Sequence, residues 1–386
     1  MVSVVREPYG FVHADKGRLK DVYGGPGGQV FVECMRIRPA QAGASKTAIL
    51  FSHPIGGGSF LPLVTALAAA GRHVIYCNPR YRGNDTALIM EKCLLDLGAC
   101  VADLKQRFGY EKVVLGGWSG GGSLSLFYQD QAVNPTIDET PAGNFVGIRE
   151  AGLQPADAVL LLAAHVSRSV TMTEWLDPSI TDETRPFARD REFNIYDPEC
   201  PQQPAYSAAF VERFRAAQIA RNRRITAWVK DELSQLKQSG EPDAERCFTV
   251  QGTMCDVRWT DPAQDPSDRP PGRCYLGDPK LANDGPVGLG RFTTLRSWLS
   301  QWSYDESRAH GEKNAARVSC PALVINNTAD LACTPSHADR LFNALASADK
   351  QIVQIKGADH YYVERRDLLA NAVGAIGDWL DTRGFG

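Results

Sequence analysis

The sequence of 386 residues lacks both a long apolar run and a marked excess of charge of either sign. No stretch approaches the roughly 20 apolar residues that cross a bilayer. The first residues carry Arg6 and Glu7 where a secretory signal needs an apolar core. Lys and Arg number 42 against 45 Asp and Glu, so no broad basic surface is expected. We therefore predict a soluble, cytoplasmic protein with no nucleic-acid or membrane partner.

Cysteine is also sparse. Ten cysteines in so long a chain are too few for a disulfide scaffold, and no CxxC pair or His/Cys cluster has the spacing of a zinc site. We expect most of them to be reduced and buried, and we predict neither a metal nor a cofactor. A disulfide stays open for four cysteines in a loop-rich region, Cys200, Cys247, Cys255 and Cys274.

Short apolar runs alternate with amphipathic helical patterns in the two end parts of the chain. Fully apolar strands of this kind are typical of a parallel sheet that is buried on both faces. We predict an α/β fold with a mostly parallel central sheet and helices on both faces. The runs expected to form strands are 47–54, 73–79, 112–117, 158–164, 322–327 and 351–355.

The alternation stops between His165 and Val318. The intervening segment is too long for a structureless loop in a compact domain. Apolar positions between Ile225 and Leu236 predict a helix there, whereas a stretch rich in Pro, Asp and Gly at 260–280 predicts a loop. We divide the chain into a core and a largely helical insertion. The core is expected to comprise 1–164 and 318–386, and the insertion 165–317.

The run from Gly117 to Gly121 matches the pattern GxSxG, with Ser119 at its centre, between a predicted strand and a predicted helix. A turn this tight crowds the backbone, and glycines relieve the clash while the serine oxygen stays exposed above the sheet edge. The helix that follows would direct its positive end toward negative charge forming there. The plainer interpretation is a glycine-rich connector with a capping serine. We identify Ser119 as the candidate nucleophile.

A serine nucleophile needs a base and a group that orients the base. Of the seven histidines, His360 stands in the loop directly after the last predicted strand. Asp330 also follows a strand, which gives the order Ser, Asp, His known for such triads. Asp359 is the rival acid, but adjacent residues on an extended loop usually point apart. The plainer roles are a surface-loop histidine for His360 and a helix-capping turn for Asp330.

An attacked carbonyl also needs hydrogen-bond donors for the oxyanion. We predict the backbone amides of Gly120 and Ile55, because Ile55 lies in a glycine-rich loop after an early strand. The glycines at 56–58 could instead form a simple turn or cradle a phosphate. A nucleotide loop is disfavoured, since the chain has no GxxxxGK[ST] and this loop lacks the GxGxxG spacing.

Taken together, these motifs resemble the α/β-hydrolase superfamily. The pattern HPxGGG from His53, the Arg82-Gly83 pair, the GxSxG serine, Asp330 and His360 occur in that family's order. The resemblance covers about residues 30–165 and 318–386. One departure is that the frequent His-Gly pair of the family is replaced here by His53-Pro54.

The resemblance implies acyl transfer. Ser119 would attack, His360 would take and return the proton, Asp330 would hold the imidazole, and water would release the acyl group. It also implies that the insertion at 165–317 is a cap, or lid, over the site.

The predicted function is that of a serine hydrolase that cleaves a carboxylic ester through an acyl-enzyme on Ser119. The ester is expected to be bulky and partly apolar or aromatic. Trp118, His165 and Tyr361 are the residues predicted to contact this small-molecule substrate. Alternatives are an acyltransferase to an alcohol, or a thioesterase, lactonase or carbon-carbon hydrolase; a non-catalytic binding protein is disfavoured. Homo-oligomer formation stays open. Five tryptophans of the insertion either line a pocket or build its core: Trp175, Trp228, Trp259, Trp298 and Trp302.

Overall fold

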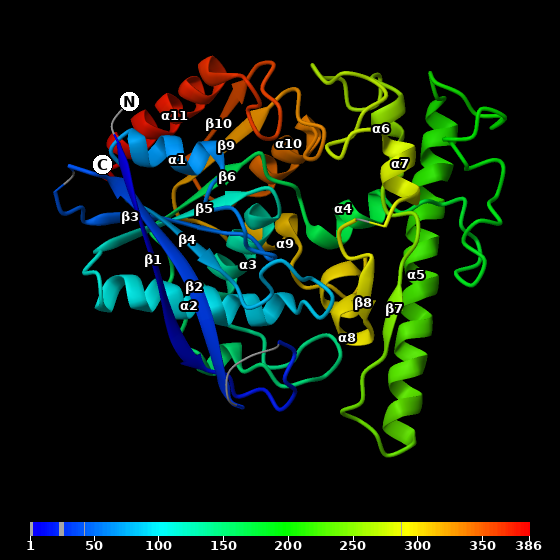
Figure 1. The fold of residues 1–386 in the computed structure, drawn as a ribbon, viewed down its shortest axis with the longest axis horizontal. Helices are drawn as coiled ribbons and strands as arrows, with labels where there is room; N and C mark the ends of the chain where they lie inside the picture. Colours follow the sequence, from blue (N-terminus) through cyan, green and yellow to red (C-terminus); the bar gives the residue numbers. More distant parts are fainter. Residues whose placement is uncertain (1–2, 23–26, 42, 287) are drawn as a thin grey trace.

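An eight-stranded sheet with helices on both faces dominates the computed structural model, which describes residues 3–22, 27–41, 43–286 and 288–386 (Figure 1). The strand order is β1-β2-β4-β3-β5-β6-β9-β10. Strand β2 runs antiparallel to both of its neighbours, and all other adjacent strands are parallel. The predicted mostly parallel sheet is thereby confirmed, and all six expected strands lie in it. The strands are β1 (Val4–Ala14), β2 (Gln29–Pro39), β3 (Thr47–Ser52), β4 (Val74–Asn78), β5 (Lys112–Trp118), β6 (Ala158–Leu162), β9 (Ala322–Asn327) and β10 (Lys350–Ile355).

Strands β1 and β2 form a long antiparallel pair that is absent from the strands predicted above. They pair over their whole length, from Val4 opposite Pro39 to Ala14 opposite Gln29. In the first half of β2, buried residues alternate with exposed ones, because only one face of this part of the sheet is covered. Polar residues such as Glu33 occupy the exposed positions, so β2 does not form a continuous apolar run in the sequence.

The helices cover the two faces of the sheet unequally. One face packs against two helices and the other against four, each through its own cluster of buried side chains. A fully buried Leu, Ile or Val side chain contributes roughly 1.5–3 kcal/mol to the free energy of unfolding, so these two clusters supply much of the drive for folding. The first face carries α1 (Pro62–Ala69) and α11 (Arg366–Asp381), and the second carries α2 (Met90–Gln106), α3 (Gly120–Val133), α9 (Gly311–Ala315) and α10 (Pro335–Ala344).

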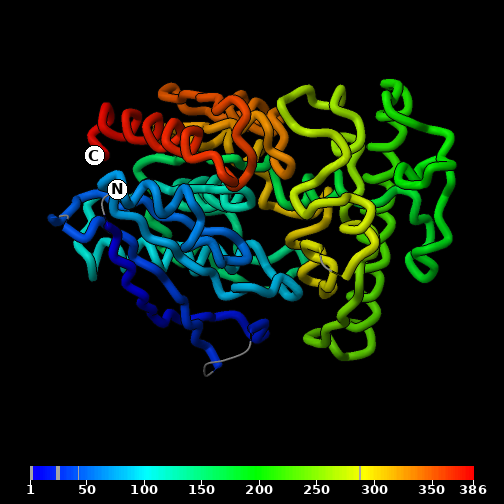
Figure 2. Tube along the Cα trace, turned by 45° about the horizontal axis from the view of Figure 1, so that its top comes forward, coloured from blue at the N-terminus to red at the C-terminus, as the bar shows by residue number. Residues whose placement is uncertain are grey.

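The segment between β6 and β9 builds most of a second body beside the sheet, on the side away from the C-terminus (Figures 1 and 2). Its longest element, α5, contains the helix predicted between Ile225 and Leu236 and extends well beyond it. Its last helix, α9, packs instead against α3 and α10 of the predicted core. The domain boundaries given above stay a prediction. The remaining elements of the segment are α4 (Arg168–Glu174), α5 (Ala208–Gln238), β7 (Cys247–Thr249), α6 (Val257–Thr260), α7 (Pro279–Asp284), β8 (Phe292–Thr294), α8 (Leu295–Ser297) and η2 (Trp298–Trp302).

Aromatic side chains build the interior of this insertion. Trp259, Trp298 and Trp302 are among the most deeply buried large side chains, and the rings of Trp298 and Trp302 stack with centroids 5.1 Å apart. Of the two roles that the sequence left open for the insertion's tryptophans, these three fill the second, because they lie in its buried clusters. All ten cysteines are free thiols, so the disulfide left open by the sequence is not formed.

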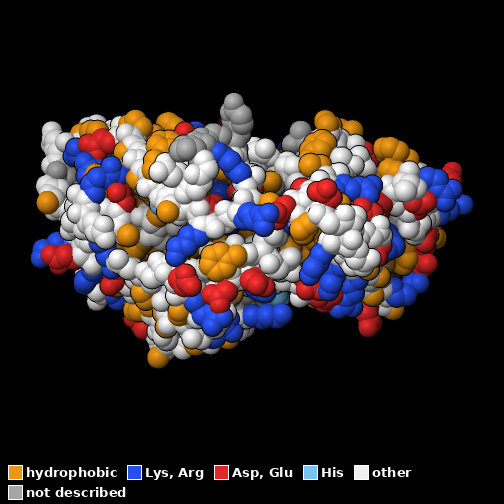
Figure 3. Space-filling view, turned by 90° about the horizontal axis from the view of Figure 1, so that it is seen from below, with side chains coloured by type: hydrophobic (Ala, Val, Ile, Leu, Met, Phe, Trp, Pro, Cys, Tyr) orange, Lys and Arg blue, Asp and Glu red, His pale blue; other side chains and the backbone are white. Residues whose placement is uncertain are grey.

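Charged side chains of both signs are interspersed over the face shown in Figure 3, with apolar side chains scattered among them. Within the described ranges, no helix combines the length and the apolar character that crossing a bilayer requires. Cellular location and the absence of a nucleic-acid partner stay predictions.

Candidate active site

Ser119 occupies a strained turn between β5 and α3. Its backbone angles are φ 53° and ψ −124°, a region that residues other than glycine rarely adopt and that costs of order 1–3 kcal/mol. A Cβ atom on Gly121 would lie 2.1 Å from the carbonyl oxygen of Ser52, and one on Gly117 would lie 2.6 Å from the Cα of Gly122. The glycines around Ser119 are therefore required by close backbone approach, as the sequence pattern indicated.

The structure brings His360 and Asp330 together. His360 Nδ1 lies 2.6 Å from Asp330 Oδ2, and both side chains are buried. Asp330 Oδ1 accepts hydrogen bonds from the amides of Ala332 and Cys333 at 2.7 and 2.8 Å. Because an ionised carboxylate only accepts, the proton of the imidazole belongs on Nδ1, and Nε2 is left as the acceptor.

Asp359, the rival acid, is occupied elsewhere. Its Oδ1 accepts hydrogen bonds from the amides of Tyr361 and Val363 at 3.0 and 3.1 Å, which closes the loop that carries His360. The geometry thus favours Asp330 over Asp359 as the partner of the imidazole.

The hydroxyl of Ser119 lies beside a thiol rather than in contact with the base. Its Oγ is 3.9 Å from Cys333 Sγ, and within the described ranges no hydrogen bond joins it to His360. Such bonds are often long or misaligned in ligand-free sites and tighten when substrate binds. Burial raises the pKa of the Cys333 thiol well above its usual value, so this sulfur stays protonated and a poor nucleophile. Side-chain atoms of Asp330, Cys333 and His360 that could bind a metal ion lie within 4.8 Å of one another. We do not assign a metal site here, because Asp330 and His360 are already hydrogen-bonded to each other.

Ser119 and His360 line one cavity of about 240 Å³. A larger cavity of about 790 Å³ lies elsewhere, between Phe127 and Arg317; it contains none of the predicted catalytic residues, so chemistry rather than size identifies the site. Core and insertion both contribute walls, and these are mostly apolar. The lining residues are His53, Ile55, Gly56, Gly57, Gly58, Leu61, Trp118, Ser119, His165, Arg168, Thr171, Met172, Trp175, Tyr275, Leu289, Ala332, His360 and Tyr361.

All three residues predicted to contact substrate, Trp118, His165 and Tyr361, line this cavity. The ring of Trp118 packs on those of His360 and Tyr361, with centroids 4.4 and 5.3 Å away. Of the insertion's five tryptophans, Trp175 is the one that reaches this wall. These contacts place the predicted substrate residues around the nucleophile, while their roles stay a proposal.

The loop predicted to hold the oxyanion also contains His53, to which the sequence pattern assigned no catalytic role. The Ile55 amide donates a hydrogen bond to His53 Nδ1 at 3.3 Å, so it is not free in this conformation. Since Nδ1 accepts, the proton of the neutral imidazole belongs on Nε2. A Cβ atom on Gly120 would lie 2.7 Å from His53 Nε2 and 3.2 Å from His165 Nε2. Two imidazoles therefore stand beside the first residue of α3, whose amide has no partner within its own helix. The sequence did contain a hint of this role, because His53 directly follows β3 and His360 lies in the loop after β10, so both are at the carboxyl ends of strands.

Both of these imidazoles are held in the neutral form. Burial, reinforced by the charge of Arg168 and by His360, lowers the pKa of His53 to about 3. Burial, reinforced by the neighbouring imidazole of His337 and by Arg168, lowers the pKa of His165 well below its usual range. Neutral imidazoles can donate from one nitrogen and accept at the other throughout the neutral pH range.

We expect the protein to lose stability as the pH falls below about 6.5, because the unfolded chain then binds protons that buried His53 does not. The loss occurs on the acid side because folding lowers the pKa of His53. Above pH ~6.5 the imidazole is neutral in both the folded and the unfolded chain, so it no longer makes stability depend on pH. For this one group the slope approaches ~1.4 kcal/mol per pH unit down to the folded pKa. Chemical denaturation of the parent and of His53→Gln at pH 7.5, 6.0 and 5.0 measures it. Identical slopes in the two proteins would contradict the buried neutral imidazole.

Comparison with known proteins identifies the fold. No protein-family model matches the chain, and no curated protein sequence is significantly similar to it. The α/β hydrolase GrgF from Penicillium sp. sh18 superposes with a TM-score of 0.53 at 11% identity, over 98% of both chains. A hypothetical protein from Pseudomonas aeruginosa gives 0.50 at 12% identity, over 97% of this chain and 94% of the other. A monoacylglycerol lipase from Paleococcus ferrophilus gives 0.45 at 16% identity, over 90% and 98%. The chain has the α/β-hydrolase fold.

Proposed function

We propose that this protein is a serine hydrolase that cleaves a carboxylic ester through an acyl-enzyme on Ser119. The observation that carries the proposal is the 2.6 Å contact between His360 Nδ1 and Asp330 Oδ2 in the cavity that also contains the strained serine. Nucleophilic catalysis by serine requires an oriented base within reach of the serine hydroxyl, and here both residues line the same cavity. The α/β-hydrolase fold is compatible with this chemistry but does not specify it.

In the proposed reaction Ser119 Oγ attacks the ester carbonyl, and its proton passes to His360 Nε2. Asp330 keeps the imidazole in the required tautomer and stabilises the imidazolium that forms. His360 then returns the proton to the departing alcohol. A water molecule, deprotonated by the same base, releases the acid. Before the attack the serine hydroxyl has to turn from Cys333 Sγ toward the imidazole, and an acyl group entering the cavity would favour that rotamer by contact.

The oxyanion would be bound by the Gly120 amide at the start of α3, assisted by the positive end of that helix. We assign the second donor to His53 Nε2–H, because it lies beside Gly120 whereas the Ile55 amide is already bonded to His53 Nδ1. This assignment departs from the one made from the sequence. The hydrogen bond from the Ile55 amide to His53 Nδ1 would then have a role of its own, because it fixes the tautomer that carries the proton on Nε2.

His53→Asn is expected to lower kcat for p-nitrophenyl butyrate by about 10²–10³-fold, the usual cost of one oxyanion donor, with little change in KM. Asn can still accept from the Ile55 amide but presents no donor at the Nε2 position. His53→Gln, whose amide nitrogen can reach that position, should retain more activity. Steady-state kinetics of the two variants separates an oxyanion role from a purely structural one. If both lost activity only through a raised KM, or neither lost it, His53 would not be a donor.

The volume of the cavity limits the size of the acyl group that can bind beside Ser119. A volume of about 240 Å³ holds a small apolar acyl group, so the remainder of a bulky ester would extend along the insertion or displace part of it. We propose an ester whose acyl part is apolar and compact and whose alcohol part is the bulky or aromatic one. A hydrolysis screen of aryl and alkyl esters with acyl chains from acetyl to decanoyl tests this, and the expected optimum is a short chain. Highest activity on decanoyl esters would refute it.

Transfer of the acyl group to an alcohol would use the same residues. Addition of alcohol acceptors to the same assay, with detection of the transacylated product, distinguishes that reaction from hydrolysis. Only the hydrolysis product is expected. Thioester, lactone and carbon-carbon substrates belong in the same screen.

A further inference from the structure

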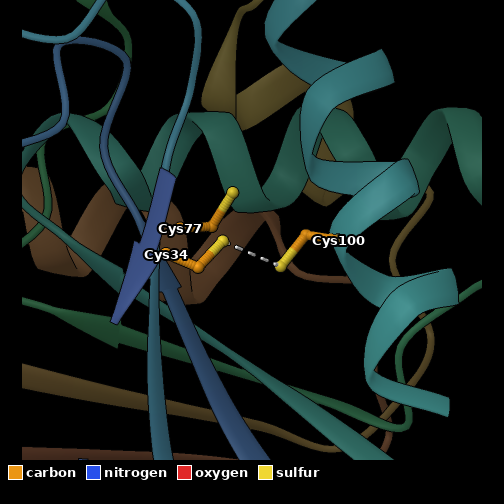
Figure 4. A group of neighbouring side chains, drawn as sticks. All are labelled: Cys34, Cys77 and Cys100. Carbon is orange, nitrogen blue, oxygen red and sulfur yellow. Dashed lines mark hydrogen bonds between the residues drawn. The ribbon is translucent and has the colours of Figure 1, made fainter. Parts of the chain in front are cut away.

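Three cysteines far apart in the sequence converge beneath the sheet (Figure 4). Cys34 on β2 and Cys77 on β4 are directly opposite each other in the antiparallel register, and Cys100 approaches them from α2. Cys34 Sγ lies 3.8 Å from Cys100 Sγ, and the three sulfur atoms all lie within 4.8 Å of one another. All three side chains are buried. None of the three lines the cavity that contains Ser119, and they play no part in the proposed reaction.

A fourth polar group belongs to this cluster. Tyr9 on β1 is in register with Cys34, so Tyr9, Cys34 and Cys77 form a row across three adjacent strands. The Tyr9 hydroxyl oxygen is buried and has no hydrogen-bond partner among the described residues. A buried polar atom without a partner costs free energy, and such exceptions call for an explanation such as an absent ion.

The spacing fits a tetrahedral thiolate site. Zinc binds cysteine sulfur at about 2.3 Å, and two ligands of a regular tetrahedron then lie about 3.8 Å apart. The sulfur atoms of Cys34 and Cys100 are 3.8 Å apart, so these two are already at the distance that two ligands of such a tetrahedron require. We propose that Cys34, Cys77 and Cys100 bind one zinc ion, with the Tyr9 hydroxyl as fourth ligand.

Binding would exchange protons for the ion. Three thiols would release three protons, so the site would change from neutral to a single net negative charge with Zn²⁺ and a neutral Tyr9 bound. The guanidinium of Arg107 lies over the Tyr9 ring, 4.9 Å from its centroid, and supplies a cation beside the site.

The ion would have a structural role. It would fasten the β1–β2 pair and β4 to α2, whose first residues contact the insertion: the Met90 amide donates to Ser300 Oγ, which in turn donates to Glu91. The ligands lie 43 and 23 residues apart (77 − 34 and 100 − 77), so no CxxC pattern announces them. This is why the sequence alone predicted no metal.

The test is the metal content of the intact protein, purified under reducing conditions without a metal-affinity tag. We expect about one zinc per chain by elemental analysis, and none in Cys100→Ala or Cys34→Ala. The matched control is Cys93→Ala, because Cys93 is equally buried on the same helix but outside the cluster; it should keep the zinc. Extraction with a chelator should lower the melting temperature of the parent and of Cys93→Ala, but not that of Cys100→Ala. Replacement by Co²⁺ should give thiolate-to-metal absorption bands that Cys100→Ala lacks.

The proposal is overturned if the parent contains no zinc and takes up neither Zn²⁺ nor Co²⁺ after reduction. It is equally overturned if Cys100→Ala binds as much zinc as the parent. Should the cysteine variants fail to fold, the zinc and cobalt content of the parent still decides. None of these readouts depends on ester hydrolysis, so failure of the zinc site and failure of the proposed function remain separate results.

Discussion

Ser119→Ala is expected to lower kcat for p-nitrophenyl butyrate by about 10⁶-fold, the scale seen when a triad serine is removed. The variant should fold normally, because alanine fits the same turn and Ser119 Oγ makes one weak contact, to Cys333 Sγ at 3.9 Å. The residual rate should exceed that of water alone, since the oxyanion donors and the cavity persist. Steady-state kinetics and thermal unfolding of the purified variant measure both effects.

A fluorophosphonate probe supplies an independent readout for the same variant. It should label the parent and fail to label Ser119→Ala. The matched control is Ser125→Ala, because Ser125 is buried on α3 but does not line the cavity; this variant should keep both labelling and turnover. Hydrolysis by Ser119→Ala at the parent rate would remove the basis of the proposed function.

Asp330→Asn is expected to lower kcat by about 10⁴-fold with little change in KM. The carboxylate accepts from His360 Nδ1 and from two backbone amides, so its oxygens have acceptor roles only. An amide can satisfy the backbone donors with its oxygen only by presenting its NH₂ group to the imidazole. That arrangement would favour the tautomer with the proton on Nε2, which can no longer accept the serine proton.

Asp359→Asn is the control for this substitution. Asp359 is adjacent to His360 in the sequence, yet its carboxylate accepts from the backbone amides of Tyr361 and Val363. It should retain activity within a few-fold of the parent, because its role is to close a loop. Equal losses in the two variants, or a larger loss in Asp359→Asn, would show that the orienting acid is assigned to the wrong residue.

The sequence predicted the parts of the site that depend on strand ends and on close backbone approach. Ser119 could be identified because the glycines around it are needed sterically, and this need is visible in the residue types. Asp330 and His360 could be identified because parallel strands deliver their following loops to one edge of the sheet. Asp330 and His360 then meet across 30 residues of chain.

The direction in which side chains point could not be predicted from the sequence. Nothing in it indicates that Ser119 Oγ rests against Cys333 or that His53 turns its Nε2 toward Gly120, because rotamers and tautomers follow from tertiary packing. The row formed by Tyr9, Cys34 and Cys77 depends on the register of β1 and β2, two strands whose mixed polar pattern was not recognised. A residue's neighbours across a sheet cannot be derived until its strand has been paired.

The measurement that tests the central claim most directly is mass spectrometry of protein quenched in acid during turnover of p-nitrophenyl butyrate. The account predicts one butyryl group per chain, located on the peptide that contains Ser119 and absent from Ser119→Ala. A butyryl group on Cys333, whose sulfur lies 3.9 Å from the serine oxygen, or on no residue at all while hydrolysis proceeds, would contradict it.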